Sequence, residues 1–295
     1  MAQKRRPLDE TSPSTVELRR ALRDLGLRPK KSLGQHFLVN VNVLQSILEA
    51  SDLSIQDIVV EIGPGLGVLT KEIARRVRQV VAVEVDGRLA SALREVLDPF
   101  SNVSVVHADI LQTDPAILLS RVGGHPPAYK VIADIPYYIT AAVLRHFLEA
   151  TVKPCCMVMM VQREVGEAIV AKPGNMTMLS VSVQFYGKPV IIDYVSSESF
   201  YPPPKVDSVI LRIDLYEHPT VEVPTIQEFF DVVRAGFSAP RKQLRNALAQ
   251  GLRLAPSDAV VLLDQAGIDS HCRAESLSLS EWARLCQVVA GNGRN

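Results

Sequence analysis

The sequence predicts an α/β protein with a doubly wound parallel sheet, followed by a smaller all-helical domain. From residue 58 onward, short apolar runs alternate with helix-like segments, and this alternation implies right-handed crossovers between parallel strands. The runs are nearly continuous in apolar residues, as expected for strands that are buried on both faces. After about Pro224 the strand pattern stops and only helix-like segments follow.

Each predicted element follows from its local pattern. The parallel strands are expected at Ile58–Glu61, Val80–Glu84, Val103–His107, Lys130–Ala133 and Cys155–Val161. The crossover helices are expected at Val68–Val77, Arg88–Leu97, Pro115–Arg121 and Ala141–Ala150. No amphipathic helix separates two later runs, so we expect both to extend the sheet with at least one antiparallel strand: Leu179–Tyr186 and Val206–Leu215. Pro or Gly separates four C-terminal helices, expected at Ile226–Phe237, Arg241–Gln250, Asp258–Gln265 and Ser280–Val289.

These elements divide the 295 residues into three predicted parts. Residues 1–30 are expected to form a flexible basic arm with a short helix near Val16–Leu25, residues 31–222 the α/β domain, and residues 223–295 the helical domain. The net charge is zero, but residues 1–40 carry nine Lys/Arg against four Asp/Glu, and residues 234–253 carry five Lys/Arg without an acid. Such patches bind phosphate locally; the alternative is two solvated helix faces.

The composition is that of a soluble globular protein. No run of about 18 apolar residues is present, so we expect no membrane span, and the Lys/Arg-rich N-terminus has no apolar core of a secretory signal. The cysteines lack the paired spacing of a metal site, which predicts no metal and reduced thiols in a cytoplasmic protein: Cys155, Cys156, Cys272 and Cys286. No feature predicts an oligomer, and we expect a monomer.

A glycine-rich turn follows the first predicted strand, at Glu61-Ile62-Gly63-Pro64-Gly65-Leu66-Gly67. Glu84 ends the second strand, where a carboxylate can accept hydrogen bonds from both ribose hydroxyls of a nucleoside cofactor. Asp109 follows the third strand and can accept from an adenine amino group, beside the apolar Ile110. Either acid alone could be a helix cap. Together these elements predict a nucleoside cofactor at the carboxyl ends of the strands.

A nicotinamide cofactor is the competing interpretation of this turn. The Gly-x-Gly-x-Gly spacing with an internal Pro departs from the dinucleotide pattern Gly-x-Gly-x-x-Gly. The motif at the end of the fourth strand also has no role in hydride transfer.

The fourth strand ends in Asp134-Ile135-Pro136-Tyr137, a sequence that suits methylation of a planar amine. The Asp134 side chain and the Ile135 carbonyl can accept from the amino hydrogens and localise the nitrogen lone pair. Pro136 fixes φ and stiffens the loop, and Tyr137 can stack on a base. If the methyl donor is a sulfonium, its positive charge drives the methyl transfer. The nitrogen then needs positioning rather than a strong general base.

Five motifs, in order, resemble the ribosomal RNA adenine dimethyltransferase family (KsgA/RsmA), over roughly residues 28–290. They are residues 31–38 (KSLGQHFL), 61–67 (EIGPGLG), 134–137 (DIPY), 200–208 (FYPPPKVDS) and 237–246 (FSAPRKQLRN). The resemblance implies a Rossmann-like class I methyltransferase domain that uses S-adenosyl-L-methionine. It implies N6,N6-dimethylation of two adjacent adenines near the 3′ end of small-subunit rRNA, within a pre-ribosomal 30S particle.

The resemblance also implies roles for single residues. Phe200 is implied to be a second aromatic residue that contacts the target base. Cofactor contacts are implied at Gln35, His36, Leu38, Gly63, Gly65, Glu84, Asp109, Ile110 and Asp134. The family usually has Asn where this chain has Asp134, and Asp keeps the acceptor oxygen while it loses the amide donor. Related amino-methyltransferases use Asp-Pro-Pro-Tyr, so we expect activity.

We expect Arg241, Lys242 and Arg245 to contact RNA phosphates, with Arg241 and Arg245 on one helix face. Two other functions remain open. One is the related family that methylates large-subunit rRNA and confers antibiotic resistance, although the segment 273–278 looks more like the small-subunit enzymes. The other is a non-catalytic assembly factor that uses the fold to bind RNA.

Overall fold

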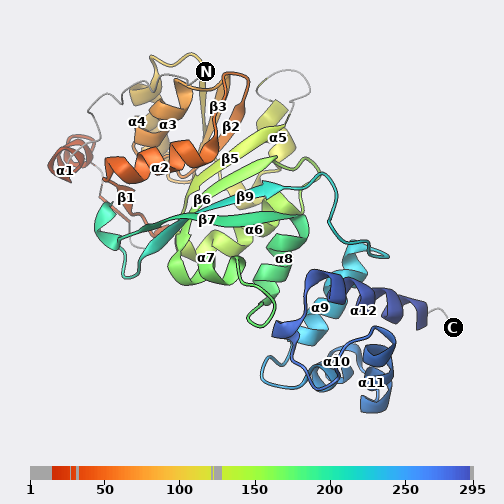
Figure 1. Ribbon diagram of the computed structural model, residues 1–295. Helices are drawn as coiled ribbons and strands as arrows, with labels where there is room; N and C mark the ends of the chain where they lie inside the picture. The colour runs from red at the N-terminus through yellow and green to blue at the C-terminus, as the bar shows by residue number, and fades with distance from the viewer. Residues whose placement is uncertain (1–14, 27, 31–32, 121, 123–127, 293–295) are drawn as a thin grey trace, which may run out of the picture. The chain divides into compact units, whose positions relative to one another are not determined.

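The computed structural model describes residues 15–26, 28–30, 33–120, 122 and 128–292. In this part of the chain one seven-stranded sheet has the order β4-β3-β2-β5-β6-β9-β7 (Figure 1). Its strands are β2 Ile58–Ile62, β3 Gln79–Glu84, β4 Val103–His107, β5 Tyr129–Asp134, β6 Cys156–Gln162, β7 Gly187–Val195 and β9 Ser208–Leu215. The five predicted parallel strands are confirmed with shifts of one residue at most.

Strands β4, β3, β2, β5 and β6 are parallel, and Val60 of β2 pairs with Val81 of β3 and Val131 of β5. Along the chain, β3 is added beside β2 and β4 beside β3. The next strand, β5, is then added on the opposite side of β2. The strand order therefore reverses between β2 and β5, and such a switch point is where open α/β sheets bind ligands.

Two antiparallel strands, β7 and β9, extend the sheet; the strand expected at Val206–Leu215 is confirmed as β9, whereas β7 was not expected at its position. A Cβ atom at Gly187, where β7 begins, would lie 2.8 Å from the backbone oxygen of Asp214, near the end of β9. Just after β7, the backbone N–H of Ser197 donates to the side chain of Asp207, just before β9. The two strands therefore run in opposite directions.

Four helices connect or cover the parallel strands where the spacing predicts them: α3 Val68–Ala74, α4 Gly87–Leu97, α5 Pro115–Ser120 and α6 Thr140–Leu148. Two further helices were not expected: α2 Val41–Ser51 and α7 Arg163–Ile169. Asn40 caps α2, because its side chain accepts a hydrogen bond from the backbone of Asn42. All five residues of β2 are buried, so both faces of the sheet are covered there.

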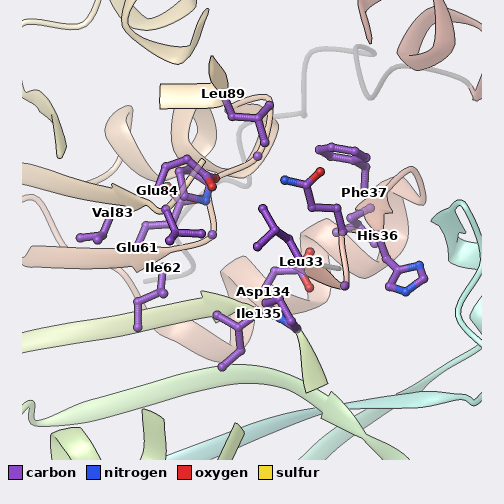
Figure 2. A pocket seen from close by; sticks show the side chains of 18 of the residues that line it. Leu33, His36, Phe37, Glu61, Ile62, Val83, Glu84, Leu89, Asp134 and Ile135 are labelled. Atoms are coloured by element: carbon purple, nitrogen blue, oxygen red, sulfur yellow. The ribbon is translucent and has the colours of Figure 1, made fainter. Parts of the chain in front are cut away.

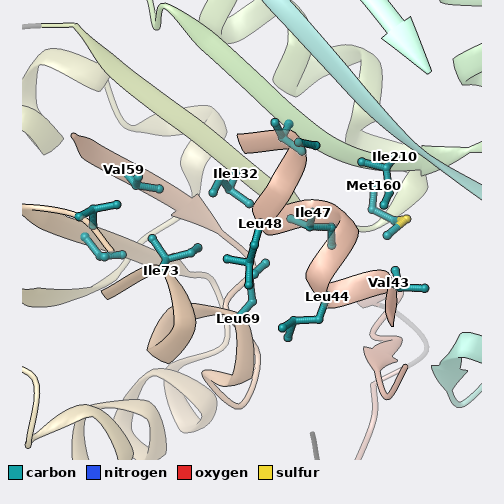
Figure 3. Close-up of a cluster of buried hydrophobic side chains, with 14 of the residues drawn as sticks. Val43, Leu44, Ile47, Leu48, Val59, Leu69, Ile73, Ile132, Met160 and Ile210 are labelled. Carbon is teal, nitrogen blue, oxygen red and sulfur yellow. The ribbon is translucent and has the colours of Figure 1, made fainter. Parts of the chain in front are cut away.

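The core on one face of the sheet is built around α2 (Figure 3). Leu44, Ile47 and Leu48 of α2 are buried in one cluster with Val59 of β2 and Ile132 of β5. These strand positions alternate with others that are buried just as completely on the opposite face. This packing holds the carboxyl ends of β2 and β5 in a constant relation.

The strand expected at Leu179–Tyr186 is wrong, because these residues lie in helix α8, Met178–Tyr186. Thr177 and Ser180 form a capping box that starts the helix. The buried side chains of α8 lie on successive turns of the helix. An alternation of small and apolar residues therefore does not distinguish a buried helix from a strand. The strand begins at the next residue, Gly187, as β7.

The described chain forms two compact units, one from residues up to Arg163 with Ile192–Arg212, the other from Glu164–Ile191 with Ile213–Asn295. The second contains the four expected C-terminal helices: α9 Ile226–Phe237, α10 Leu244–Leu252, α11 Pro256–Gln265 and α12 Leu279–Asn292. The predicted domain boundary after residue 222 stays a prediction. None of the helices described is long and apolar enough to cross a membrane.

The helix expected in the N-terminal arm is present as α1, Thr15–Asp24. Leu18 and Leu22 on its inner face are buried with Phe37 and Leu89 of the first unit. Residues 1–14, which hold the rest of the basic cluster of the predicted arm, lie outside the described residues.

Candidate active site

A cavity of about 390 Å³ lies at the carboxyl ends of the central strands (Figure 2). It brings together every residue that the sequence predicts for cofactor binding and catalysis. These lining residues are Gln35, His36, Leu38, Gly63, Gly65, Glu84, Asp109, Ile110, Asp134, Ile135, Pro136, Tyr137 and Phe200. The predicted RNA-contact residues belong to the second unit.

The glycine turn is shaped by three glycines with positive φ, Gly63 at 73°, Gly65 at 57° and Gly67 at 77°. A Cβ atom at Gly63 would lie only 2.5 Å from the backbone oxygen of Asp134, and one at Gly65 would lie 3.3 Å from Phe37. Glycine is therefore needed here for two reasons: the backbone is left-handed, and neighbouring atoms lie too close to leave room for a side chain. This approach sets the floor of the cavity against the end of β5.

Glu84 and Asp109 differ in how their carboxylates are held. The Glu84 side chain accepts a hydrogen bond of 2.9 Å from the backbone N–H of Asp86, and Asp86, not Glu84, caps α4. Burial raises the pKa of Glu84. Asp109 caps the short helix η2, Ile110–Gln112, through the backbone of Leu111. The helix-cap interpretation thus holds for Asp109, whose carboxylate also lines the cavity.

The end of β5 forms the wall opposite the glycine turn. Asp134 is enclosed by protein, although the cavity leaves part of its surface open, and Ile135 is 4% exposed. Tyr137 begins the short helix η3, Tyr137–Ile139, and its hydroxyl is hydrogen-bonded to the side chain of Ser208. Because Ser208 begins β9, this bond fixes the tyrosine ring to the sheet.

Two motifs that are far apart in the sequence meet in a second, two-stranded sheet. Strand β1, Phe37–Leu38, pairs antiparallel with β8, Phe200–Tyr201, so Leu38 lies opposite Phe200. The Nδ1–H of His36 donates to the backbone oxygen of Pro202 at 2.6 Å. The pairing places Phe200 and the N-terminal motif on the same cavity wall.

Helix α1 adds a wall that the sequence did not predict. Leu18 of α1 lines the cavity with 1% of its surface exposed. Arg19 on the same helix lies over the ring of Tyr201, with 4.7 Å from its guanidinium carbon to the ring centroid. Lys30, just after α1, forms an ion pair of 2.6 Å with Asp86. These contacts connect the N-terminal segment to both sides of the cavity.

Glu61 is a second site residue that sequence reasoning missed. It is 1% exposed and lines the cavity, and its Oε2 atom has no hydrogen-bond partner. Burial raises the pKa of Glu61 to about 8, and the nearby negative charge of Asp134 adds to the shift. An acid at the last-but-one residue of a strand, just before a glycine turn, was the available signal.

The cavity has the electrostatic character of a site for a cation. Four acidic residues line it: Glu61, Glu84, Asp109 and Asp134. Figure 2 shows Glu84 and Asp134 on different sides of the cavity. Among the lining residues that the structure describes, none is a Lys or Arg. A positively charged ligand would compensate these acids and provide a partner for the unpaired oxygen of Glu61.

The predicted RNA-contact residues lie at the start of α10, in the second unit. Arg241 and Lys242 are exposed, and Arg245 is half-buried. The expected helix range is wrong at its start, because α10 begins at Leu244 and Arg241 lies in the preceding turn. Arg241 and Arg245 therefore do not share a helix face, although the backbone N–H of Lys242 bonds back to Ala239 and shapes the turn.

The same order of motifs occurs in known proteins. A family model described as ribosomal RNA adenine dimethylase matches residues 26–290. The chain belongs to this family. Among its relatives, a protein from Dehalococcoides mccartyi named ribosomal RNA small subunit methyltransferase A is 49% identical over 90% of each chain. A protein of the same name from Moorella thermoacetica is 41% identical over 91% of this chain and 95% of its own.

Two solved structures relate the ribosomal RNA adenine dimethylase family to known folds. A dimethyladenosine transferase from Plasmodium falciparum has a TM-score of 0.74 at 23% identity, covering 88% of this chain and 98% of its own, and this likeness shows the fold. The 23S rRNA methyltransferase ErmE has a TM-score of 0.69 at 29% identity, covering 86% of this chain and 99% of its own. The Rossmann-like class I methyltransferase fold with a C-terminal helical region is thus confirmed.

Proposed function

We propose that this protein transfers methyl groups from S-adenosyl-L-methionine to the N6 atoms of two adjacent adenines in the 3′-terminal hairpin loop of small-subunit (16S) rRNA. One observation supports small-subunit rRNA as the substrate. The chain is 49% identical to a small-subunit enzyme over 90% of its length, but 29% identical to the large-subunit enzyme ErmE. The natural substrate is rRNA within a pre-ribosomal 30S particle in the cytoplasm.

The cavity supports the cofactor by its chemistry. S-adenosyl-L-methionine carries a positive sulfonium and a positive amino group, and the described part of the cavity lining has four acidic side chains and no Lys or Arg. Glu84 would hold the ribose hydroxyls, Asp109 and Ile110 the adenine, and the unpaired oxygen of Glu61 is a partner for the amino group. The Gly63–Gly67 turn, Gln35, His36 and Leu38 would enclose the rest. When bound, the cofactor supplies an electrophilic methyl group.

The end of β5 positions the adenine. The Asp134 side chain and the Ile135 carbonyl accept from the two amino hydrogens, which directs the nitrogen lone pair toward the methyl group. Pro136 holds the loop rigid. Tyr137, fixed by Ser208, and Phe200, fixed by its pairing with β1, bind the base by stacking. Positioning of this kind accounts for most of the acceleration when the electrophile is already activated.

RNA binding is assigned to two basic surfaces. Residues 31–222 form the methyltransferase domain, and residues 223–295 form an RNA-binding domain in which Arg241, Lys242 and Arg245 contact phosphates. The exposed Arg19, Arg20 and Arg23 of α1 add positive charge at the cavity wall. The enzyme acts as a monomer.

A methylation assay with labelled cofactor tests this function. Small subunits from cells that lack the modification, and large-subunit rRNA, are incubated with the parent protein and with Asp134→Ala. Label at adenines of the small subunit that is lost in the variant supports the proposal. Label only in large-subunit rRNA would favour the antibiotic-resistance activity, and binding of particles without label in either substrate would favour an assembly factor.

A further inference from the structure

Asp134 presents a carboxylate to which no side chain or backbone group among the described residues donates a hydrogen bond. It stands at the end of β5 and faces the cavity. An Asn at this position would present an amide instead of a carboxylate. An amide can accept a hydrogen bond but does not take up a proton near neutral pH, whereas a carboxylate does both. Asp134 is therefore a proton-binding group at the place where the amine would be methylated.

The groups around Asp134 leave its negative charge without a protein cation. The titratable side chains that line the same cavity come from β2, β3, the turn before η2, the loop before β1, and η3: Glu61, Glu84, Asp109, His36, Tyr137 and Tyr138. The nearby cation Lys30 is already bound to Asp86. His36 directs its Nδ1–H to Pro202, away from the acids (Figure 2). Among the described residues no cation lines the cavity beside Asp134, so a bound ligand would supply the positive charge.

We propose that the Asp134 carboxylate accepts the proton that leaves the adenine amino group at each methyl transfer, an inference that rests on the proposed function. The nitrogen lone pair forms the N–C bond while the C–S bond breaks and its electrons stay on sulfur. The nitrogen, now positive, loses one N–H proton to a carboxylate oxygen of Asp134 and keeps the electrons of that bond. The products are a neutral methylated amine, a neutral thioether and protonated Asp134, which returns its proton to water before the second transfer.

The charge of the bound ligand controls the pKa of Asp134 during the reaction. Burial raises the pKa of Asp134 to about 7. A nearby cation favours the ionised carboxylate, so the pKa of Asp134 falls while the positively charged donor is bound. Methyl transfer removes that positive charge. The proton affinity of Asp134 therefore rises as the amine releases its proton.

The first test counts protons on ligand binding, without turnover. Titration calorimetry at pH 7, in buffers of different ionisation enthalpy, compares the methyl donor with its neutral product S-adenosylhomocysteine. For the donor we expect the parent to release about half a proton more than Asp134→Asn, because a group near its pKa is about half protonated. The control variant Glu95→Gln, at an exposed position of α4, should release as many protons as the parent. Equal proton release from the parent and Asp134→Asn would overturn the proposal.

The second test follows single-turnover methylation of small subunits between pH 5.5 and 8.5. The carboxylate must be ionised to accept a proton, so the parent rate should fall about tenfold per pH unit below the pKa of the bound enzyme. We expect this fall to be absent in Asp134→Asn and present in the control Glu95→Gln, with thermal unfolding as the check that both fold. An unchanged acid limb in Asp134→Asn would reject the role as acceptor.

The two tests separate this inference from the function on which it rests. If the parent methylates no small-subunit adenine, the proposed function fails and the role of Asp134 as acceptor fails with it. The proton counts from calorimetry would then still show whether the Asp134 carboxyl titrates with ligand charge. Methylation by the parent, with the same acid limb in parent and Asp134→Asn, would leave the function standing and remove only the proton acceptor.

Discussion

The backbone of Gly63 lies directly against the carbonyl of Asp134, so that a Cβ atom added to the glycine would approach the oxygen to 2.5 Å. One residue belongs to the turn predicted to hold the cofactor and the other to the strand end predicted to hold the adenine. Their contact joins the two halves of the site across the β2–β5 switch point. Any change in one is transmitted to the other through main-chain atoms.

Gly63→Ala should therefore damage both structure and cofactor binding. The residue has a φ of 73°, and neither Gly63 nor the Asp134 backbone can move freely. We expect a loss of stability above the roughly 1–3 kcal/mol of backbone strain alone and at least a tenfold weaker affinity for S-adenosyl-L-methionine, measured by chemical denaturation and calorimetry. The matched control is Gly267→Ala, with a φ of 67° and no heavy atom within 4 Å of its added Cβ. Equal effects of the two changes would contradict the role of the contact.

Substitution at Asp134 should separate its acceptor oxygen from its charge. Asp134→Ala removes the acceptor for an amino hydrogen, and we expect a decrease in kcat of about 100-fold, comparable to loss of one positioned hydrogen bond in other active sites. Asp134→Asn keeps an acceptor oxygen and should retain measurable methylation, within about tenfold of the parent at pH 8. Single-turnover assays on unmethylated small subunits give both rates. An Ala variant as active as the parent would remove Asp134 from the mechanism.

The Tyr137 hydroxyl and ring should have different roles. The hydroxyl bonds to Ser208, and the ring is proposed to stack on the adenine. Tyr137→Phe should reduce methylation only slightly, whereas Tyr137→Ala should lose stacking of about 1–3 kcal/mol, a weakening of roughly 10- to 100-fold in RNA affinity or rate. Ser208→Ala is the control that removes the hydrogen bond and keeps the ring. The stacking role fails if the Phe and Ala variants lose equal activity.

The ligand-free enzyme should lose stability as the pH rises toward 8. Burial raises the pKa of Glu61 to about 8, so between pH 4.5 and 8 the folded state binds more protons than the unfolded state. Stability from this group is present at low pH and decreases with pH, by up to about 1.4 kcal/mol per pH unit. Glu61→Gln should flatten this decrease, measured by urea denaturation at several pH values, and the exposed Glu95→Gln on α4 should not. A steeper decrease in Glu61→Gln would contradict the assigned burial.

Neutralising Arg241, Lys242 and Arg245 to Ala should weaken RNA binding and its dependence on salt. Each phosphate contact that is lost lowers the slope of log K against log salt by roughly 0.7–0.9. We expect a slope that is shallower by about 2 for the triple variant, measured by filter binding or fluorescence anisotropy with small-subunit RNA. Arg94→Ala, an exposed change on α4, is the control. An unchanged slope in the triple variant rejects these contacts.

Helix α8 and strand β7 mark where prediction from the sequence fails. The run at Leu179–Tyr186 alternates polar and apolar residues as a strand does. Its helix is decided by the Thr177–Ser180 capping box and by burial within the second unit. In contrast, the parallel strands and α3 and α4 were predicted closely, because a buried strand between turn residues and a helix with one apolar face are local patterns.

The sequence by itself determined the acids and glycines of the site, since parallel strands bring their carboxyl ends to one edge and residues such as Gly63, Glu84 and Asp134 must then converge. Tertiary structure alone decided the rest. The pairing of Leu38 with Phe200 closes a loop of more than 150 residues, and the burial of Glu61 and the position of Leu18 depend on what packs around them. The local sequence of either segment does not show that the two will pack together. The free energy of such a contact comes from surfaces that meet only in the folded chain.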